Sequence, residues 1–380
     1  MKKKNNHKKL YMFLTIVVVL VAILCRLRYI NVNAGDYEYF LQYWYGFFEM
    51  NGIKGLGFYP FDYAPLYVTF LAIFSYIPIS HLIITKMFSY LFEILLAVLI
   101  YKYLSLINKK DNKYLNILLS SLILLAPTPI FNTGYWCQCD SIYTFFVVLA
   151  LYLYSKGHIN KSFISLGVAF SFKLQFIFVL PVFIILFFRD KKIKWYQFLY
   201  IPLMNLLFSI PSFIFGFSLK DLLNIYLTQT SEYASRLTWY VNNIYELVDF
   251  SFMGDYAIKI MSIITILIFV LLLLYCIGKK IKFDNKNILQ LAILSILICN
   301  LFLPCMHERY LYMADLISII YVLIYRRCYF QALLINFISM VSYAYFVFAF
   351  FSIPSRLVAV VFILVTINQF LIFRKYSLRR

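Results

Sequence analysis

The chain has 380 residues, of which 63% are apolar and only 13% are charged, and its formal net charge is +19. Soluble globular proteins contain about 45–50% apolar and about 25% charged residues. This composition excludes an ordinary soluble domain, and the recurring apolar runs of roughly 20 residues predict an all-α, polytopic transmembrane helical bundle.

The positive charge is not gathered on a surface that would suit nucleic acid. Of the 35 Lys and Arg residues, 25 lie in short clusters between apolar runs. Cytoplasmic loops of membrane proteins carry such an excess, so we expect the clusters in the cytoplasm and no nucleic acid partner. The clusters lie at residues 2–9, 102–113, 156–161, 189–194, 279–286, 326–327 and 374–380.

The first predicted element is a helix at residues 10–29 that runs outward from the cytoplasm. Its basic start and apolar core resemble a signal peptide, but Arg26 and Arg28 follow the core at once, and only Ala34 offers a weak cleavage site. An uncleaved signal anchor is therefore the preferred interpretation. A polar and aromatic outer loop follows at about residues 30–65.

Residues 66–79 are apolar but too few for an ordinary span. If they crossed the membrane, the next predicted span at residues 82–104 and every later basic cluster would be inverted. If they form an interfacial or re-entrant helix, all clusters fall on one side. We prefer the second alternative, which gives about twelve spans with both termini inside. The later spans are expected at residues 114–130, 141–154, 162–188 (a pair), 196–217, 256–278, 288–303, 311–325, 329–351 and 357–373.

Residues 162–188 have basic clusters on both flanks, so they must cross the membrane twice or not at all. This segment is too short for two spans of about 20 residues each. We expect two short helices that meet at Lys173, Leu174 and Gln175. A backbone break at that depth has to line a protein or water-filled cavity, so Lys173 is predicted to be a buried cation.

Three polar segments interrupt the apolar pattern, at residues 35–38, 136–140 and 307–310, and the charge pattern places all three at the outer face. Asp36 in the first segment has aromatic neighbours, and burial among them would raise its pKa unless a cation compensates. Such a carboxylate suits a general base that deprotonates a hydroxyl. A solvated loop acid is the alternative, and Asp36 alone does not decide between the two.

The second segment places Asp140 directly before a predicted helix, where it is either a helix cap or part of a site. Trp136 and Gln138 beside it suggest a surface for a sugar or a lipid headgroup. In the third segment, His307, Glu308 and Arg309 lie at a span boundary. They form either a functional site or a structural ion-pair network that includes Asp315.

Few cations are expected on the outer side, and Lys173 and Arg309 are the two among the polar segments. A lipid-linked phosphate would need such partners. Lys86 either lines the same site together with Glu93, or its ammonium group extends to the membrane interface.

No cofactor and no metal are expected. A metal site would have to use Asp36, Asp140, His307 and Glu308, and no pair of them has a strong ligand spacing. The seven cysteines are scattered, and a structural role is preferred to a disulfide among those expected to face outward. These are Cys137, Cys139 and Cys305.

Five short motifs between about residues 30 and 315 carry a family resemblance. They are Gly35-Asp36-Tyr37 with Phe40-Leu41, Tyr63-Ala64-Pro65-Leu66-Tyr67, Trp136-Cys137-Gln138-Cys139-Asp140-Ser141-Ile142, Phe172-Lys173-Leu174-Gln175 and Met306-His307-Glu308-Arg309-Tyr310. In this order they resemble the GT-C superfamily of polyprenyl-phosphate-sugar-dependent glycosyltransferases. The chain is most similar to bacterial proteins that resemble the second mannosyltransferase of GPI-anchor assembly. The segment at residues 242–245 is similar to the asparagine-rich part of that family's last large outer loop. Cys137 departs from the family, where a small residue such as Gly is more usual, and so does the acid at Glu38.

We expect one membrane domain over residues 1–380, with outer loops at about residues 30–65 and 218–255. The resemblance covers about residues 30–315. The resemblance implies Asp36 as the catalytic base and interfacial helices after the first span. We expect an inverting transfer of a hexose from a polyprenyl-phosphate donor to a hydroxyl of an extracytoplasmic glycan or lipid-linked acceptor, at the outer face of the cell membrane. Lys173 and Arg309 would bind the donor phosphate. Substrate binding is expected at Trp136, Gln138, Asp140, Asn243, His307 and Glu308.

Two other functions stay open at this point. A polysaccharide polymerase or ligase that uses diphosphate-linked oligosaccharides usually carries a large outer loop rich in Arg and His, whereas residues 218–255 contain only Lys220 and Arg236 as basic residues. A lipid-linked-sugar flippase tends to have pseudo-symmetric halves and polar residues near the midplane. The sequence shows neither feature, so the glycosyltransferase is preferred.

Overall fold

The computed structural model describes residues 2–108, 112–231, 236–248, 250, 254, 256–349 and 352–378. Part of the basic cluster at 102–113, part of the outer loop at 218–255 and the end of the basic segment at 374–380 lie outside the described residues.

The described residues form seventeen α-helices and one short parallel pair of strands, which confirms the expected all-α architecture. The helices are α1 Lys2–Tyr29, α2 Gln42–Asn51, α3 Pro65–Phe74, α4 His81–Ile107, α5 Lys113–Ser121, α6 Pro127–Pro129, α7 Asp140–Ser155, α8 Ile159–Phe172, α9 Leu180–Arg189, α10 Tyr200–Phe208, α11 Ile210–Ile214, α12 Leu219–Ser231, α13 Tyr256–Gly278, α14 Asn285–Phe302, α15 Tyr312–Tyr325, α16 Tyr329–Phe348 and α17 Ser355–Leu378. The strands are β1 Thr238–Trp239 and β2 Met306–His307. Short 3-10 or π-helical segments are η1 Tyr37–Leu41, η2 Gly52–Gly57, η3 Leu122–Leu125, η4 Ile130–Tyr135, η5 Leu174–Val179, η6 Trp195–Leu199 and η7 Ile244–Glu246.

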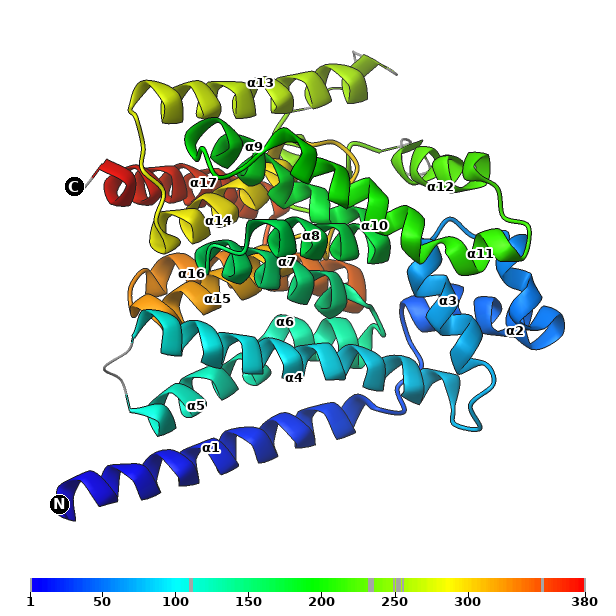
Figure 1. The fold of residues 1–380 in the computed structure, drawn as a ribbon, viewed down its shortest axis with the longest axis horizontal. Helices are drawn as coiled ribbons and strands as arrows, with labels where there is room; N and C mark the ends of the chain where they lie inside the picture. Colours follow the sequence, from blue (N-terminus) through cyan, green and yellow to red (C-terminus); the bar gives the residue numbers. More distant parts are fainter. Residues whose placement is uncertain are drawn as a thin grey trace.

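The long helices run side by side, with α1 and α13 at opposite edges of the bundle (Figure 1). Only 6% of the apolar core of α1 and 22% of that of α13 is buried by the rest of the chain, against 83% for α14. Such apolar faces suit contact with lipid. The two ends of the chain lie at one end of the bundle, and α2, α3 and α12 gather at the other end (Figure 1).

Six of the described helices are long and apolar enough to cross a membrane, and a bent pair would make a seventh. These lengths are compatible with a multi-pass membrane protein, but they do not confirm the expected number of about twelve spans. The six are His7–Tyr29, His81–Ile107, Tyr256–Gly278, Asn285–Phe302, Tyr329–Phe348 and Ser355–Leu378, and the pair is Lys113–Leu125 with Pro127–Tyr135.

Breaks in the helices explain why fewer spans meet that length. The bent pair turns by 46° where Ala126 is extended, as the residue before a proline tends to be. At Lys173 the backbone is also extended (φ −159°, ψ 138°), so α8 ends at Phe172 and η5 begins at Leu174. The expected break within residues 162–188 is therefore confirmed at the predicted position. Helix α3 has only 10 residues, about 15 Å, which is well short of a bilayer core of about 30 Å.

Three side chains hold the C-terminal end of α1 in the bundle. They are Lys86 and Glu93 of α4 and Arg26 of α1 itself. The Lys86 ammonium is fully buried and donates to the carbonyls of Tyr29 and Val32, at 2.8 and 2.7 Å. Arg26 donates to the buried Glu93 carboxylate, with the closest N–O distance at 2.5 Å. Lys86 thus points into the bundle and binds the end of α1 just before Asp36.

Candidate functional site

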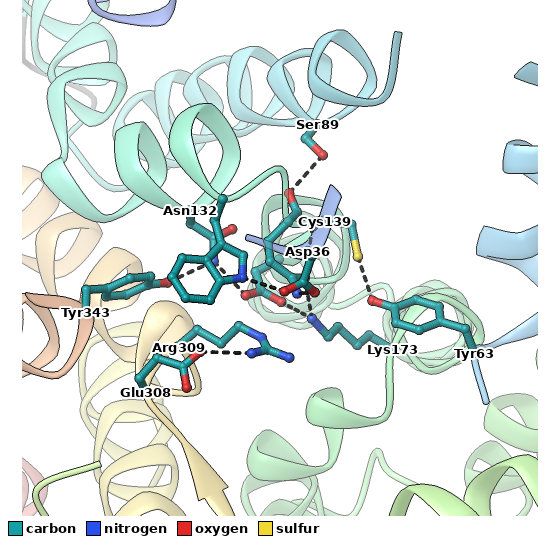
Figure 2. Close-up of polar contacts among 12 residues, drawn as sticks. Asp36, Tyr63, Ser89, Asn132, Cys139, Lys173, Glu308, Arg309 and Tyr343 are labelled. Atoms are coloured by element: carbon teal, nitrogen blue, oxygen red, sulfur yellow. Dashed lines mark hydrogen bonds and ion pairs between the residues drawn. The ribbon is translucent and has the colours of Figure 1, made fainter. Parts of the chain in front are cut away.

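The three polar segments and the Lys173 break meet beside a cavity of about 340 Å³. Figure 2 shows Asp36, Lys173 and Arg309 close together, although they come from distant parts of the chain. Asp36, Lys173 and Arg309 line one part of the cavity together with Gln175. The remaining wall is largely apolar, with residues that include Phe172, Ile177, Phe178, Ile258 and Leu303. The cavity is therefore amphipathic.

The Asp36 carboxylate is half-buried and receives two hydrogen bonds from the second polar segment. Trp136 Nε1 donates to Oδ1 at 2.5 Å, and Gln138 Nε2 donates to Oδ2. Burial raises the pKa of Asp36, while the cationic groups of Arg309 and Lys173 and the Trp136 hydrogen bond act in the opposite direction. The net shift is upward, which suits a carboxylate that has to accept a proton near neutral pH.

Backbone geometry brings these groups together. Gly35 has φ +59°, and a Cβ at this position would lie 3.0 Å from the Trp136 ring and 3.1 Å from its carbonyl oxygen. The Asp36 N–H donates to that same carbonyl at 3.2 Å. Cys137 also has a positive φ of 60°, a conformation that Gly adopts readily and other residues rarely adopt. A tight, partly strained loop thus presses Trp136 against the first polar segment.

Lys173 forms a buried ion pair with Asp140. Its Nζ donates to Asp140 Oδ1 at 2.5 Å and to Gln138 Oε1 at 2.9 Å. Because Gln138 also donates to Asp36, one amide connects the Lys173 cation with the Asp36 carboxylate. The second oxygen of Asp140 accepts from Asn132 Nδ2 at 2.8 Å, so Asp140 has partners on both sides.

Helix α4 supports the second polar segment from behind. Ser89 Oγ donates to the Gln138 carbonyl at 3.2 Å, and Ser141 Oγ donates to the Ser89 carbonyl at 3.0 Å. On the other side, Asn132 Nδ2 also donates to the Tyr343 hydroxyl at 2.8 Å (Figure 2). The segment is therefore fixed by contacts from two neighbouring elements.

The third polar segment directs Arg309 to the cavity. Arg309 Nη1 donates to Glu308 Oε1 at 2.9 Å, and the Glu308 carboxylate is fully buried. Burial acts to raise the pKa of Glu308, but the Arg309 charge and the His307 hydrogen bond outweigh it and lower this pKa overall. His307 stacks on Trp239 at 5.8 Å between ring centroids, within the β1–β2 pairing, and burial lowers its pKa.

Of the nine residues expected at the site, three line the cavity: Asp36, Lys173 and Arg309. Four more lie behind these three. Gln138 contacts Asp36, Asp140 contacts Lys173, and Glu308 contacts both Arg309 and His307. The ring of Trp136 is buried and lies 4.6 Å from that of Phe346, so in this structure it is not an open platform. The expected substrate-binding roles of these residues stay predictions.

Asn243 lies away from the cavity lining. It is fully buried, its Nδ2 donates to the Asn300 carbonyl at 3.2 Å, and its Oδ1 accepts from the Tyr245 N–H. The side chain caps η7 and holds this loop to α14. Asp315, which the alternative of a structural ion-pair network included, instead accepts a hydrogen bond from Thr128 Oγ1 at 2.8 Å.

For several polar residues of the cavity wall the sequence predicts no role. They are Asp62, Tyr63, Gln175, Gln229 and Tyr310. Tyr63, Gln175 and Tyr310 fall within the quoted motifs, so their sequence context was a usable signal. Asp62 and Gln229 had none, because only the fold brings α12 against the first outer loop. Gln229 Nε2 donates to the Asp62 carbonyl at 2.6 Å.

All seven cysteines are free, so none of the conceivable disulfides is present. The Cys139 sulfur instead lies 2.9 Å from the Tyr63 hydroxyl. Within the described part of the chain, no three His, Cys, Asp or Glu residues are grouped so that they could hold a metal ion.

A scan against models of known protein families finds no match, and a search of curated proteins finds no significant match. Only the site itself therefore indicates a function. Its chemistry combines a carboxylate with a raised pKa, the buried cation of Lys173, the partly buried cation of Arg309 and an apolar extension of the cavity. Such a site can take a proton from a neutral group while it binds an anion that carries an apolar tail.

Proposed function

We propose that this chain is a membrane glycosyltransferase that transfers a hexose from a polyprenyl-phosphate-linked donor to a hydroxyl, with inversion at the anomeric carbon. The observation that carries the proposal is the amphipathic cavity. Asp36, Lys173 and Arg309 lie at its polar part, and apolar residues such as Ile177 and Ile258 line the remainder. A lipid-linked sugar phosphate has the same division between an anionic head and an apolar tail.

Asp36 acts as the general base in this proposal. Its carboxylate takes the proton of the acceptor hydroxyl as the acceptor oxygen attacks the anomeric carbon of the donor sugar. The bond between that carbon and the phosphate oxygen breaks, and its electron pair stays on the phosphate. A single in-line displacement of this kind inverts the anomeric configuration.

Lys173 and Arg309 stabilise the phosphate as it leaves. Two of the three N–H donors of Lys173 have protein partners, Gln138 and Asp140, which leaves one for a ligand. Arg309 uses Nη1 for Glu308, while its buried Nε has no hydrogen-bond partner among the described residues. A phosphate oxygen is the kind of acceptor that would satisfy these donors.

The surrounding groups keep the charges in place. Trp136 and Gln138 orient the Asp36 carboxylate, and Glu308 orients Arg309. An anionic donor near Asp36 repels its negative charge and partly neutralises the Lys173 and Arg309 cations. Donor binding therefore raises the pKa of Asp36 further.

We also place the site at the extracytoplasmic face, because the basic clusters then lie in the cytoplasm. A cysteine introduced at the exposed position Met50 should be labelled from outside intact cells. A cysteine introduced at the exposed position His158 should be labelled only after permeabilisation. The reverse pattern, with native cysteines blocked beforehand, would exclude this orientation.

The decisive experiment compares Asp36→Asn with Glu38→Gln in purified protein reconstituted in nanodiscs. Transfer is measured from polyprenyl-phosphate-linked mannose, glucose and galactose to a mixed pool of lipid-extracted and soluble glycans. Asp36→Asn keeps size and polarity but cannot take the proton, so transfer should fall by roughly 10²–10⁴-fold. Donor binding should persist.

Glu38→Gln is the matched control, because it removes the charge of a neighbouring exposed acid. Its transfer rate should stay within a few-fold of the wild-type rate. If Asp36→Asn transfers sugar at a near wild-type rate, Asp36 is not the base.

A further inference from the structure

A second cavity, of about 410 Å³, lies between the first outer loop and α12. Residues 57–62 form one wall, with Phe58 and Asp62 among them, and Asp221, Asn224 and Thr228 of α12 belong to the other. We propose that this cavity is the acceptor subsite and binds a neutral sugar unit of the acceptor glycan. The inference rests on the glycosyltransferase function proposed above and specifies where its second substrate binds.

The two walls are fixed against each other by close packing. A Cβ on Gly57 would lie only 1.9 Å from the Phe215 carbonyl oxygen, so only glycine permits this approach of the loop to the segment before α12. Beside it, the rings of Tyr59 and Phe217 stack with centroids 4.9 Å apart and planes at 10°. Rigid walls of this kind reduce the entropy lost on binding a ligand.

The lining combines an aromatic ring with groups that form hydrogen bonds. Phe58 is 58% exposed, and its ring meets that of Phe47 at 72°, in an edge-to-face contact. Across the cavity, Asp221 and Asn224 are exposed on α12. An apolar ring with a few placed carboxylate and amide groups fits a sugar, which has an apolar face and a rim of hydroxyls.

The charge of the lining separates this cavity from the first. Two carboxylates, those of Asp62 and Asp221, contribute to it, and no Lys, Arg or His is among the described residues that line it. Hydrogen bonds from the Ser218 hydroxyl and N–H lower the pKa of Asp221 and keep it ionised. An anionic group such as the donor phosphate is therefore disfavoured here, whereas a neutral glycan is not.

The second cavity adjoins the first. Asp62 lines both, and Gln229 of α12, which lines the first cavity, donates to the Asp62 carbonyl at 2.6 Å. A glycan bound over Phe58 can therefore extend past Asp62 toward Asp36.

The test is saturation-transfer NMR on the full chain in nanodiscs, with the methyl glycosides of mannose, glucose, galactose and N-acetylglucosamine as probes and empty nanodiscs as blank. At least one glycoside should bind the wild-type protein. Phe58→Leu keeps an apolar side chain but lacks the aromatic face, so binding should weaken roughly 3- to 10-fold. Phe58→Trp should retain binding, and Asn224→Ala should weaken it by a similar factor.

Phe330→Leu is the matched control, since Phe330 is also exposed but lies on α16. If no probe binds, or if Phe58→Leu binds as tightly as the wild type and Phe330→Leu, the subsite is wrong. The same probes on Asp36→Asn keep the two proposals apart. Asp36→Asn should bind the glycosides like the wild type but lose transfer. If the wild-type protein itself binds a glycoside but transfers no sugar, the proposed function is overturned and the sugar site stands.

Discussion

Removal of the Lys173 ammonium tests whether this residue is only a structural partner of Asp140 or also a phosphate ligand. Its Nζ lies 2.5 Å from Asp140 Oδ1, and the two side chains are only 6% and 2% exposed. Lys173→Met has a similar length and leaves the Asp140 carboxylate buried without its cation. The variant also removes the donor to Gln138 Oε1.

Breaking a buried ion pair by removing one partner lowers the free energy of unfolding by about 3–5 kcal/mol, because the remaining charge stays buried and uncompensated. Replacing both partners by neutral residues is often close to neutral. Lys173→Met should therefore be destabilised by that amount, and Lys173→Met/Asp140→Asn should recover to within about 1 kcal/mol of the wild type. In the double variant, the amide introduced at position 140 can still contact Asn132 and can donate to Gln138.

Equilibrium unfolding in mixed micelles measures these differences. Lys161→Met, at an exposed position of α8, is the control and should stay within about 0.5 kcal/mol of the wild type. On the same samples, binding of a polyprenyl-phosphate hexose should be weak in both Lys173 variants, although the double variant is stable. If the double variant regains both stability and donor binding, Lys173 only neutralises Asp140, and its assignment to the phosphate is refuted.

Three further outcomes are expected. The base must be ionised and burial raises the pKa of Asp36, so kcat/KM should fall as the pH decreases through a value above the usual Asp pKa of about 3.9. A profile that stays flat down to about pH 3.9 would contradict this. Gly35→Ala should displace the Trp136 ring and lower kcat roughly tenfold with little change in donor KM, whereas an unchanged kcat would show that the contact is not needed. Cys137→Gly should change the free energy of unfolding by less than about 1 kcal/mol, because the relief of backbone strain at φ 60° offsets the lost side-chain packing. Cys137→Val should lower the free energy of unfolding by about 2 kcal/mol. If both variants have equal effects on unfolding in micelles, the backbone at Cys137 is not strained.

Much of the architecture could be predicted because it follows from local composition. Apolar runs broken by polar and proline-containing stretches require helices, and the expected break in residues 162–188 falls at Lys173 as predicted. The number of about twelve spans is not confirmed, because it follows only from the requirement that all basic clusters lie on one side of the membrane. Whether a short helix such as α3 crosses a bilayer depends on neighbours that composition does not specify.

The sequence by itself determined that the chain is helical and apolar, that its polar residues fall into three segments, and that one of its lysines lies at a helix break. Only the tertiary structure decided which of these groups meet. Asp36 receives hydrogen bonds from residues about 100 positions away, and Arg309 reaches the same cavity from near the far end of the chain. Lys86 binds the end of α1, and Asn243 caps a loop. The spacing of residues along the sequence cannot specify such contacts. Which residues face each other depends on how the helices pack, and the packing depends on the shapes of all the side chains between them.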